Sequence, residues 1–404
     1  SCNNLQDFYC FSRIIIKFKL SGEVNIMGIT VKEALKLKGL DRAKLIAGEK
    51  GLDRFIKRVS VIECPESPEL FTEGDFFITA FFALKEDVDA QLSMIQALVD
   101  CGCSGLCVID MYLSDLSESV KRLADKACFP VMILPNVVPY AEIITNVMDA
   151  IIQSKDDIIN EMHVDTMLLP GKTAREIYET AKKINARFKE KIVAAFYENV
   201  VFSAEDILRK LKNRTDLPDH WSLLKYKSGV LVLMSFGNES KKGIDLRIDA
   251  IIKAVEGIGG KYRLGISTLH EALSEINMCI KEALLACDAA RAMEDKNIVF
   301  YRDLGIYRLL MLLKNEPELK NYMSEIINPV KEYDRKYRTR LLETMISYVE
   351  NDGDIARTAK ALFLHVNTIR YRIEKIKEVL HMEHMVGGFY EQISIAVKIH
   401  KLCR

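Results

Sequence analysis

The stretch DIARTAKALFLHVNTIRYRIEKIKEVL, residues Asp354–Leu380, decides the architecture of the C-terminal part of this chain. Asp354 follows a predicted helix over Arg340–Glu350 and can cap the next helix by accepting a backbone N–H. Ala359 is small, which suits a place where two crossing helices approach closely. The apolar seam recurs at helical spacing and consists of Leu362, Leu364, Ile369, Ile373 and Ile376. Two short helices separated by about three residues predict a helix-turn-helix within Ile355–Ile376.

The polar side chains of this segment are of the kinds that contact DNA. Arginine and lysine bind phosphates, arginine pairs with guanine, and asparagine pairs with adenine. Between Ile355 and Lys377, six basic side chains accompany one acidic side chain, Glu374. We predict a DNA-binding face made of Arg357, His365, Asn367, Thr368, Arg370, Tyr371, Arg372 and Lys375. A second basic run, Arg335–Arg340, is expected to contact flanking phosphates. The alternative is a solvated basic face on an ordinary helical unit.

Upstream, residues 30–150 alternate between short apolar runs and segments of helical period. The apolar runs are Val59–Ile62, Phe76–Ala80, Leu106–Ile109 and Val131–Leu134, and the helical segments are Val88–Val99 and Leu116–Ala127. Strands that alternate with amphipathic helices indicate a parallel or mixed α/β domain.

A long segment of helical period, Ile143–Met167, follows and stops at Pro170-Gly171. It is expected to link domains and is a candidate for dimerisation. Beyond it, the predicted strands are Ile192–Tyr197, Leu223–Tyr226, Val230–Phe236 and Tyr262–Ile266, with a hairpin signal at Ser228-Gly229, and the predicted helices are Ala174–Phe188, Ile244–Val255 and Leu269–Arg291. This order suggests a second α/β domain with a mostly antiparallel sheet. From about Asp303 onward the pattern is helical, so the fold class is multidomain α/β plus all-α.

The composition is that of a globular multidomain chain. At roughly 100–200 residues per domain, 404 residues predict two to four domains. The 57 basic and 57 acidic side chains cancel, so the net charge neither supports nor excludes DNA binding. Ten scattered cysteines without a signal peptide favour reduced thiols and a cytoplasmic location. No apolar run approaches the roughly 18 residues of a membrane span, so no membrane partner is expected.

The first residues look unlike the rest of the chain. Met27 is followed by Gly28-Ile29-Thr30-Val31 and resembles a natural start. Residues 1–27 are therefore interpreted as a translated leader or a disordered segment.

Several motifs that suggest other chemistry are better explained as local structure. Pro170-Gly171-Lys172-Thr173 ends like a phosphate-binding loop but has Thr166 where that motif needs glycine, so it is interpreted as a helix stop and restart. The glycines around Gly259 are interpreted as a turn. Cys101, Cys103 and Cys107 lack a matching pair of ligands, as do His381 and His384, so no metal site is expected. We expect no cofactor and no catalytic residues.

The C-terminal segment resembles a known family. The stretch LLETMISYVENDGDIARTAKALFLHVNTIRYRIEKI, Leu341–Ile376, is similar to the helix-turn-helix of the purine-catabolism regulator (PucR) and sugar-diacid regulator (CdaR) family. Two further stretches resemble the family's N-terminal sensory domain, TVKEALKLKGL at Thr30–Leu40 and GEKGLDRFIKRVSVIE at Gly48–Glu63. Residues 192–310 resemble its central domain. Val366 departs from the family, which often has arginine there. The central region also lacks the G-G-[DE]-E-F stretch of active cyclases.

The resemblance implies a domain order and a function. The expected domains are a PucR-like sensory domain over 28–150, a helical linker over 151–190, a central GGDEF-like domain over 191–310 and a DNA-binding domain over 330–404. The chain is then expected to activate a catabolic operon, to respond to a small-molecule effector and to bind double-stranded promoter DNA as a homodimer or higher oligomer. A non-enzymatic scaffold protein is the alternative, and an enzyme would need a group of catalytic residues that the sequence does not show.

Overall fold

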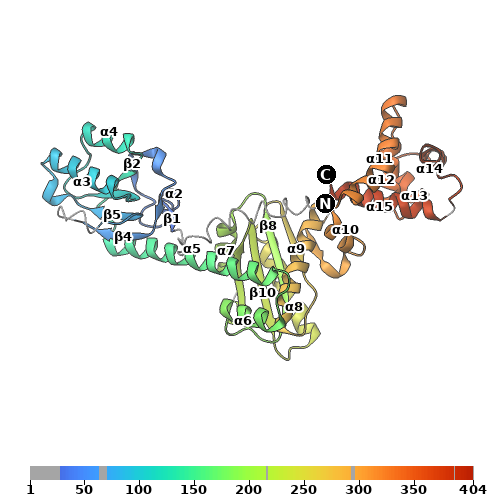
Figure 1. Ribbon diagram of the computed structural model, residues 1–404, viewed down its shortest axis with the longest axis horizontal. Helices are drawn as coiled ribbons and strands as arrows, with labels where there is room; N and C mark the ends of the chain where they lie inside the picture. The colour runs from blue at the N-terminus through green and yellow to red at the C-terminus, as the bar shows by residue number, and fades with distance from the viewer. Residues whose placement is uncertain (1–27, 63–70, 215–216, 293–295, 386, 404) are drawn as a thin grey trace. The chain divides into compact units, whose positions relative to one another are not determined.

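The computed structural model describes residues 28–62, 71–214, 217–292, 296–385 and 387–403 (Figure 1). The predicted leader, 1–27, lies outside the described residues. The chain divides into two compact units with a boundary between Ile159 and Asn160. No helix of the described ranges is both long enough and apolar enough to cross a membrane.

The first unit contains a five-stranded sheet in the order β2-β7-β6-β5-β4. Strands β4 to β7 pair in parallel, and β2 joins the edge antiparallel to β7. The strands are β2 (Lys44–Ala47), β4 (Arg58–Val61), β5 (Asp75–Thr79), β6 (Gly105–Asp110) and β7 (Val131–Pro135), with a separate antiparallel pair of β1 (Ile29–Thr30) and β3 (Phe55–Ile56). The predicted mixed α/β architecture is confirmed.

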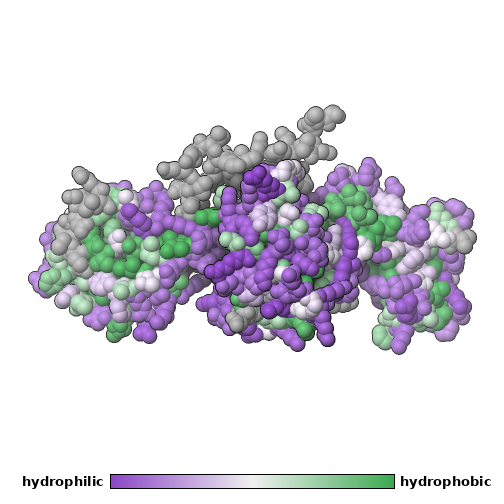
Figure 2. Space-filling model, turned by 90° about the horizontal axis from the view of Figure 1, so that it is seen from below, coloured by the Kyte–Doolittle hydropathy of each residue, from purple (hydrophilic) through white to green (hydrophobic). Residues whose placement is uncertain are grey.

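Helices cover both faces of this sheet. Phe77 belongs to the core under α3 and α4, whereas its neighbour Phe76 belongs to the core under α2 and the first part of α5. This alternation explains why the central strands are continuous apolar runs, since both of their faces are buried. The helices are α2 (Val31–Ala34), α3 (Val88–Asp100), α4 (Glu118–Lys126) and α5 (Tyr140–Leu168). Figure 2 also shows hydrophobic side chains exposed on the part of this unit that faces the viewer.

Helix α5 confirms the predicted long helical segment and is packed at each end. Ile143 and Val147 are fully buried in the first unit, and Val164 is fully buried in the second. The helix ends before Pro170-Gly171, and Thr173 then caps α6 (Ala174–Ile184) in a reciprocal pair of hydrogen bonds with Glu176. The stop-and-restart interpretation of this motif is therefore confirmed.

The second unit begins with a five-stranded sheet in the order β12-β11-β8-β10-β9, antiparallel except for the pair β11–β12. The strands are β8 (Lys191–Asn199), β9 (Trp221–Tyr226), β10 (Gly229–Phe236), β11 (Tyr262–Ile266) and β12 (Ile298–Phe300). Helices α6 and α9 (Ile276–Ala292) cover one face, and α7 (Ala204–Arg214) and α8 (Lys241–Glu256) cover the other. The predicted mostly antiparallel sheet is confirmed.

Three details differ from the sequence analysis. The hairpin turn is Lys227-Ser228, and Gly229 is instead needed because a Cβ there would lie 2.3 Å from the Tyr197 carbonyl oxygen. The helix predicted from Leu269 begins only at Ile276, because His270 forms a β-bridge with Ile192. Helix α7 and strand β12 were not predicted from the sequence.

Candidate nucleic-acid interface

The C-terminal part of the second unit is helical, as predicted. Its helices are α10 (Tyr307–Leu313), α11 (Pro317–Tyr337), α12 (Leu341–Glu350), α13 (Ile355–Ala361), α14 (Val366–Leu380) and α15 (Gly388–Leu402). Helices α11 to α15 enclose one core, to which Ala359, Ile369, Ile373 and Ile376 contribute. Ala359 is buried between the two helices, so α13 and α14 form the helix-turn-helix expected from the sequence.

Side-chain caps fix where both helices begin. The Asp354 carboxylate accepts the N–H of Arg357 at 2.9 Å, and this bond holds the pKa of the Asp354 carboxyl below its usual value. The cap is therefore present above the ordinary carboxyl pKa and is lost as the pH falls through the lowered value. His365 caps α14, because its Nδ1 accepts the N–H of Asn367 at 3.2 Å. This bond requires Nδ1 to carry no proton.

The turn between the helices has an unusual residue at its centre. Phe363 has φ of +53°, a left-handed conformation that favours glycine, and its side chain is 95% exposed. The N–H of Leu364 bonds to the Ala359 carbonyl and that of Phe363 to the Lys360 carbonyl, the pattern that ends many helices. The ring contributes nothing to the core, and Phe363 is not among the residues of the predicted DNA-binding face. The sequence signal for including Phe363 is an aromatic residue at the position where the first helix of the helix-turn-helix must end.

The first half of α14 presents a polar face to solvent. Asn367, Arg370 and Tyr371 are exposed and recur at i, i+3 and i+4, on the opposite side of the helix from Ile369 and Ile373. Within the described part of the chain, none of the three has an ion pair or a side-chain hydrogen bond. Their donors and acceptors are therefore available to a partner.

Other members of the predicted DNA-binding face, in contrast, have partners within the protein. Arg372 is half-buried and its Nη1 donates to Oγ1 of Thr344 on α12 at 2.9 Å. Lys375 bonds to Glu378 at 2.6 Å, and this bond raises the pKa of the lysine.

Arg357 lies within 3.6 Å of the Asp352 carboxylate and 3.3 Å of that of Asp354. Thr368 is half-buried. The structure therefore brings Asn367, Arg370 and Tyr371 together on one open face and orients Arg372 toward the domain's own core.

The second basic run lies where α11 ends and α12 begins. Arg338 ends α11 with φ of +56°. The Asp334 carboxylate on α11 accepts the N–H groups of Leu341 and Leu342 at 2.7 and 2.9 Å, and so caps α12 from a neighbouring helix. Arg335, Lys336 and Arg340 are exposed around this junction.

Two of the three cysteines that suggested a metal site are core residues. Cys103 and Cys107 are fully buried, and burial raises the pKa of each thiol to about 12. Both thiols are therefore protonated at neutral pH and pack as small apolar groups. Among the described residues, no cluster of three His, Cys, Asp or Glu side chains could hold a metal ion.

Comparison with protein families finds two matches along the chain. Residues 33–151 match the purine catabolism regulatory protein-like family, and residues 341–399 match the PucR C-terminal helix-turn-helix domain. The second match contains α12, α13 and α14, including the whole polar face described above.

Three curated relatives are similar over parts of their length. The DNA-binding transcriptional activator AdeR of Bacillus subtilis is 26% identical over 117 residues, 28% of this chain and 28% of the relative. The purine catabolism regulatory protein of the same organism is 22% identical over 134 residues, 33% of this chain and 25% of the relative. The carbohydrate diacid regulator of Escherichia coli is 22% identical over 260 residues, 61% of this chain and 66% of the relative. The matched region thus spans less than two thirds of each relative.

Proposed function

Because the chain carries an N-terminal PucR-like domain and the C-terminal PucR helix-turn-helix, we propose that it is a transcriptional regulator that binds double-stranded promoter DNA through α14. The observation that carries this proposal is the open face of Asn367, Arg370 and Tyr371, whose polar groups have no internal partner. The major groove admits an α-helix, and asparagine and arginine there distinguish adenine and guanine. The start of α14 carries the positive end of the helix dipole, which favours a nearby phosphate.

Different roles follow for the other residues of the predicted face. Arg357 and Lys375 serve as phosphate contacts from the two sides of the recognition helix, and His365 and Thr368 lie at its start. Arg372 holds α14 against α12 through Thr344, so its substitution affects the orientation of the recognition helix as well as any contact with DNA.

We propose Arg370→Ala as the test of this function. A duplex is first selected from random sequence with the full chain, and binding is then measured by fluorescence anisotropy across a salt series. The variant should bind the selected duplex more weakly by about 1–3 kcal/mol, because one bidentate base contact is lost. Circular dichroism should show an unchanged fold, since the side chain is exposed.

Arg175→Ala is the matched control, because it removes one exposed arginine from α6. It should bind the selected duplex as the unchanged protein does. If Arg370→Ala also binds normally, α14 does not read DNA through this face. If the full chain selects no duplex at all, the alternative of a non-enzymatic interaction protein is favoured.

The remaining regions complete the proposal. Residues 28–150 sense a small-molecule effector, 151–190 link the domains, the GGDEF-like region 191–310 relays the signal without catalysis, and 330–404 bind DNA as a dimer in the cytoplasm. The name of AdeR, a transcriptional activator, supports activation over repression. We propose that the regulated operon is catabolic. An operon for the breakdown of purines, sugar acids or amino acids fits this proposal equally well.

A further inference from the structure

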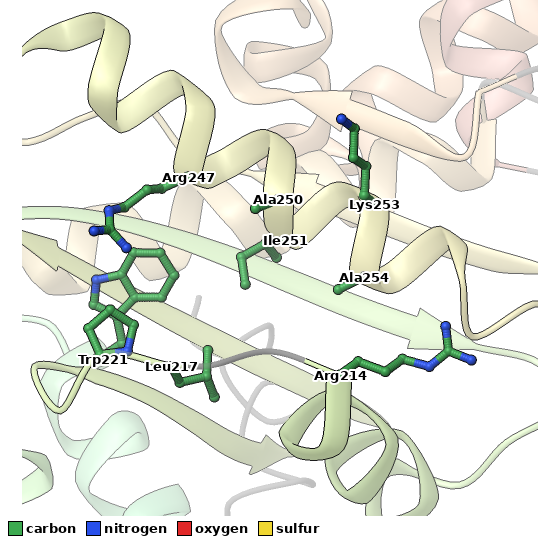
Figure 3. Close-up of a pocket in the computed structure, with 9 residues that line it drawn as sticks. Arg214, Leu217, Trp221, Arg247, Ala250, Ile251, Lys253 and Ala254 are labelled. Atoms are coloured by element: carbon green, nitrogen blue, oxygen red, sulfur yellow. The ribbon is translucent and has the colours of Figure 1, made fainter.

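A cavity of about 510 Å³ opens in the second unit between the end of α7, the start of β9 and one side of α8 (Figure 3). Its size lies in the range of roughly 300–1,000 Å³ that is usual for small-molecule sites. The apolar part of its wall is formed by Leu217, Trp221 and Ile251, and the charged part by Arg214, Arg247 and Lys253. None of the described residues that line the cavity is acidic.

The apolar wall is held in place before any ligand arrives. The indole Nε1 of Trp221 donates to the carbonyl oxygen of Ser235 at 2.9 Å, and the ring packs edge-on against Phe236 with 5.6 Å between centroids. Arg247, Ile251 and Ala254 are spaced by four and three residues on α8, so one face of that helix lines the cavity. Binding therefore requires little reordering of the wall.

The charged groups lie at different ends of the cavity. Figure 3 shows the Arg247 guanidinium beside the indole, with 5.9 Å between its central carbon and the ring centroid, and Arg214 at the other end. Lys253 extends away from the indole in the same view. The Arg214 side chain runs against Gly257, where a Cβ would lie 2.3 Å from its Nη1.

These three cations have no carboxylate partner among the described residues, whereas their neighbours do. On α7, Arg209 pairs with Asp206 at 3.0 Å, and on the far face of the sheet Arg291 pairs with Glu198 at 2.8 Å. Within the described part of the chain the fold gains no ion pair from these three cations, so the cavity carries positive charge that no carboxylate there offsets. An anion in the cavity would offset part of this positive charge.

We propose that this cavity binds a small organic anion with an aromatic or aliphatic body. The carboxylate or phosphate accepts hydrogen bonds from Arg247 or Arg214, and the body of the ligand lies on Trp221, Leu217 and Ile251. Arginine binds both kinds of anion in a bidentate manner, so carboxylate and phosphate are both compatible with the geometry. This site goes beyond the DNA-binding function, and it can be measured with no DNA present.

The only tryptophan of the chain is in the wall of this cavity, which provides a direct probe. The full chain is titrated with benzoate, phenyl phosphate and benzyl alcohol while tryptophan emission is recorded, and calorimetry gives a second readout. Benzoate, phenyl phosphate or both should change the emission saturably, and benzyl alcohol, which has the ring without the charge, should not. The stronger of the two anions identifies the acid group that the site prefers.

Substitutions then assign the binding to the cavity. Replacing whichever of Arg214 and Arg247 bonds to the acid group with alanine should weaken binding of the preferred anion about tenfold, the usual effect of one charge-assisted hydrogen bond. Arg209→Ala, on the same helix as Arg214 but paired with Asp206, should leave the affinity unchanged. Because Arg247 touches the indole and its loss can alter the emission itself, its affinity is taken from calorimetry.

Three results would overturn the proposal. They are the absence of saturable binding of either anion in both readouts, equal binding of benzyl alcohol, and retention of full affinity by the two arginine variants. None of these results bears on whether α14 binds DNA, so a failure here leaves the proposed function intact.

Discussion

At the scale of single residues, Phe363 has a strained backbone and an exposed ring, and neither stabilises the fold. Its positive φ places a Cβ in a strained position, and its ring is 95% exposed. The residue lies at the turn that leads into the recognition helix, so a partner of the domain is the natural recipient of the ring. An apolar ring in the major groove can contact the methyl group of thymine.

We expect Phe363→Gly to raise the free energy of unfolding by about 1 kcal/mol, because glycine adopts this conformation without the Cβ penalty. The same variant should bind the selected duplex more weakly with an unchanged salt slope, since the phenyl ring neutralises no phosphate. Thermal unfolding and anisotropy across a salt series check the two effects.

Phe363→Ala is the matched control, because it removes the ring but keeps the Cβ at positive φ. It should lose affinity as Phe363→Gly does, without the gain in stability. Normal DNA binding by both variants would remove Phe363 from the interface, and a lower melting temperature for Phe363→Gly would show that the ring supports the fold.

The sequence predicts which residue types lie on the proposed DNA-binding face better than it predicts which partner each of them contacts. Asn367, Arg370 and Tyr371 lie open on α14, as their polarity and spacing suggest. The sequence cannot show that Arg372 turns toward Thr344, because that bond joins positions 28 residues apart. For the same reason, the cavity lined by Arg214, Arg247 and Lys253 becomes visible only when α7 and α8 are placed side by side.

At the scale of elements, α12 depends on a cap that another helix supplies. Asp334→Ala should loosen the first turn of α12, because the N–H groups of Leu341 and Leu342 lose their acceptor. A loss of about 0.5–2 kcal/mol corresponds to roughly 2- to 30-fold faster local exchange. Hydrogen–deuterium exchange of peptides that cover 341–350 measures this directly, and it avoids assuming two-state unfolding of a multidomain chain.

Asp354→Ala is the control for this experiment, since it removes the cap of α13 and should leave exchange in α12 unchanged. Unchanged exchange in Asp334→Ala would mean that water replaces the carboxylate at no cost. Equal acceleration in both variants would mean that α12 and α13 open together.

Elements with strong internal patterns were predictable, and those held by distant partners were not. The long apolar runs of the first sheet and the helical period of α5 appear in the structure close to their expected bounds. Strands β1 and β3 are two residues each and exist because Ile29 pairs with Ile56 across 27 positions. Helix α7 could have been found, because Ile207, Leu208 and Leu211 form an apolar stripe at helical spacing.

At the scale of the whole molecule, the proposed dimer makes a geometric prediction. Two recognition helices related by a two-fold axis contact half-sites about one helical turn, 10–10.5 base pairs, apart or at multiples of this spacing. Insertion of about 5 base pairs at the centre of a selected palindrome should place the half-sites on opposite faces of the duplex and reduce affinity strongly. Insertion of a full turn should restore part of it.

Anisotropy on the three duplexes, with light scattering to count the protein copies bound, tests this expectation. Equal affinity for all three spacings, with one copy bound to each duplex, would contradict dimeric recognition. That result would leave the contact between α14 and a single half-site in place.

The cap that Asp334 provides also couples α11 to the helices of the proposed DNA-binding domain. Both carboxylate oxygens are engaged by consecutive N–H groups of α12, so the joint tolerates little rotation before both bonds break together. Arg372 fastens α14 to the same helix α12 through Thr344. Because α11, α12 and α14 also share one core, a rotation of α11 would reach α14 through this packing, through the two parallel bonds of Asp334 and through the bond between Arg372 and Thr344.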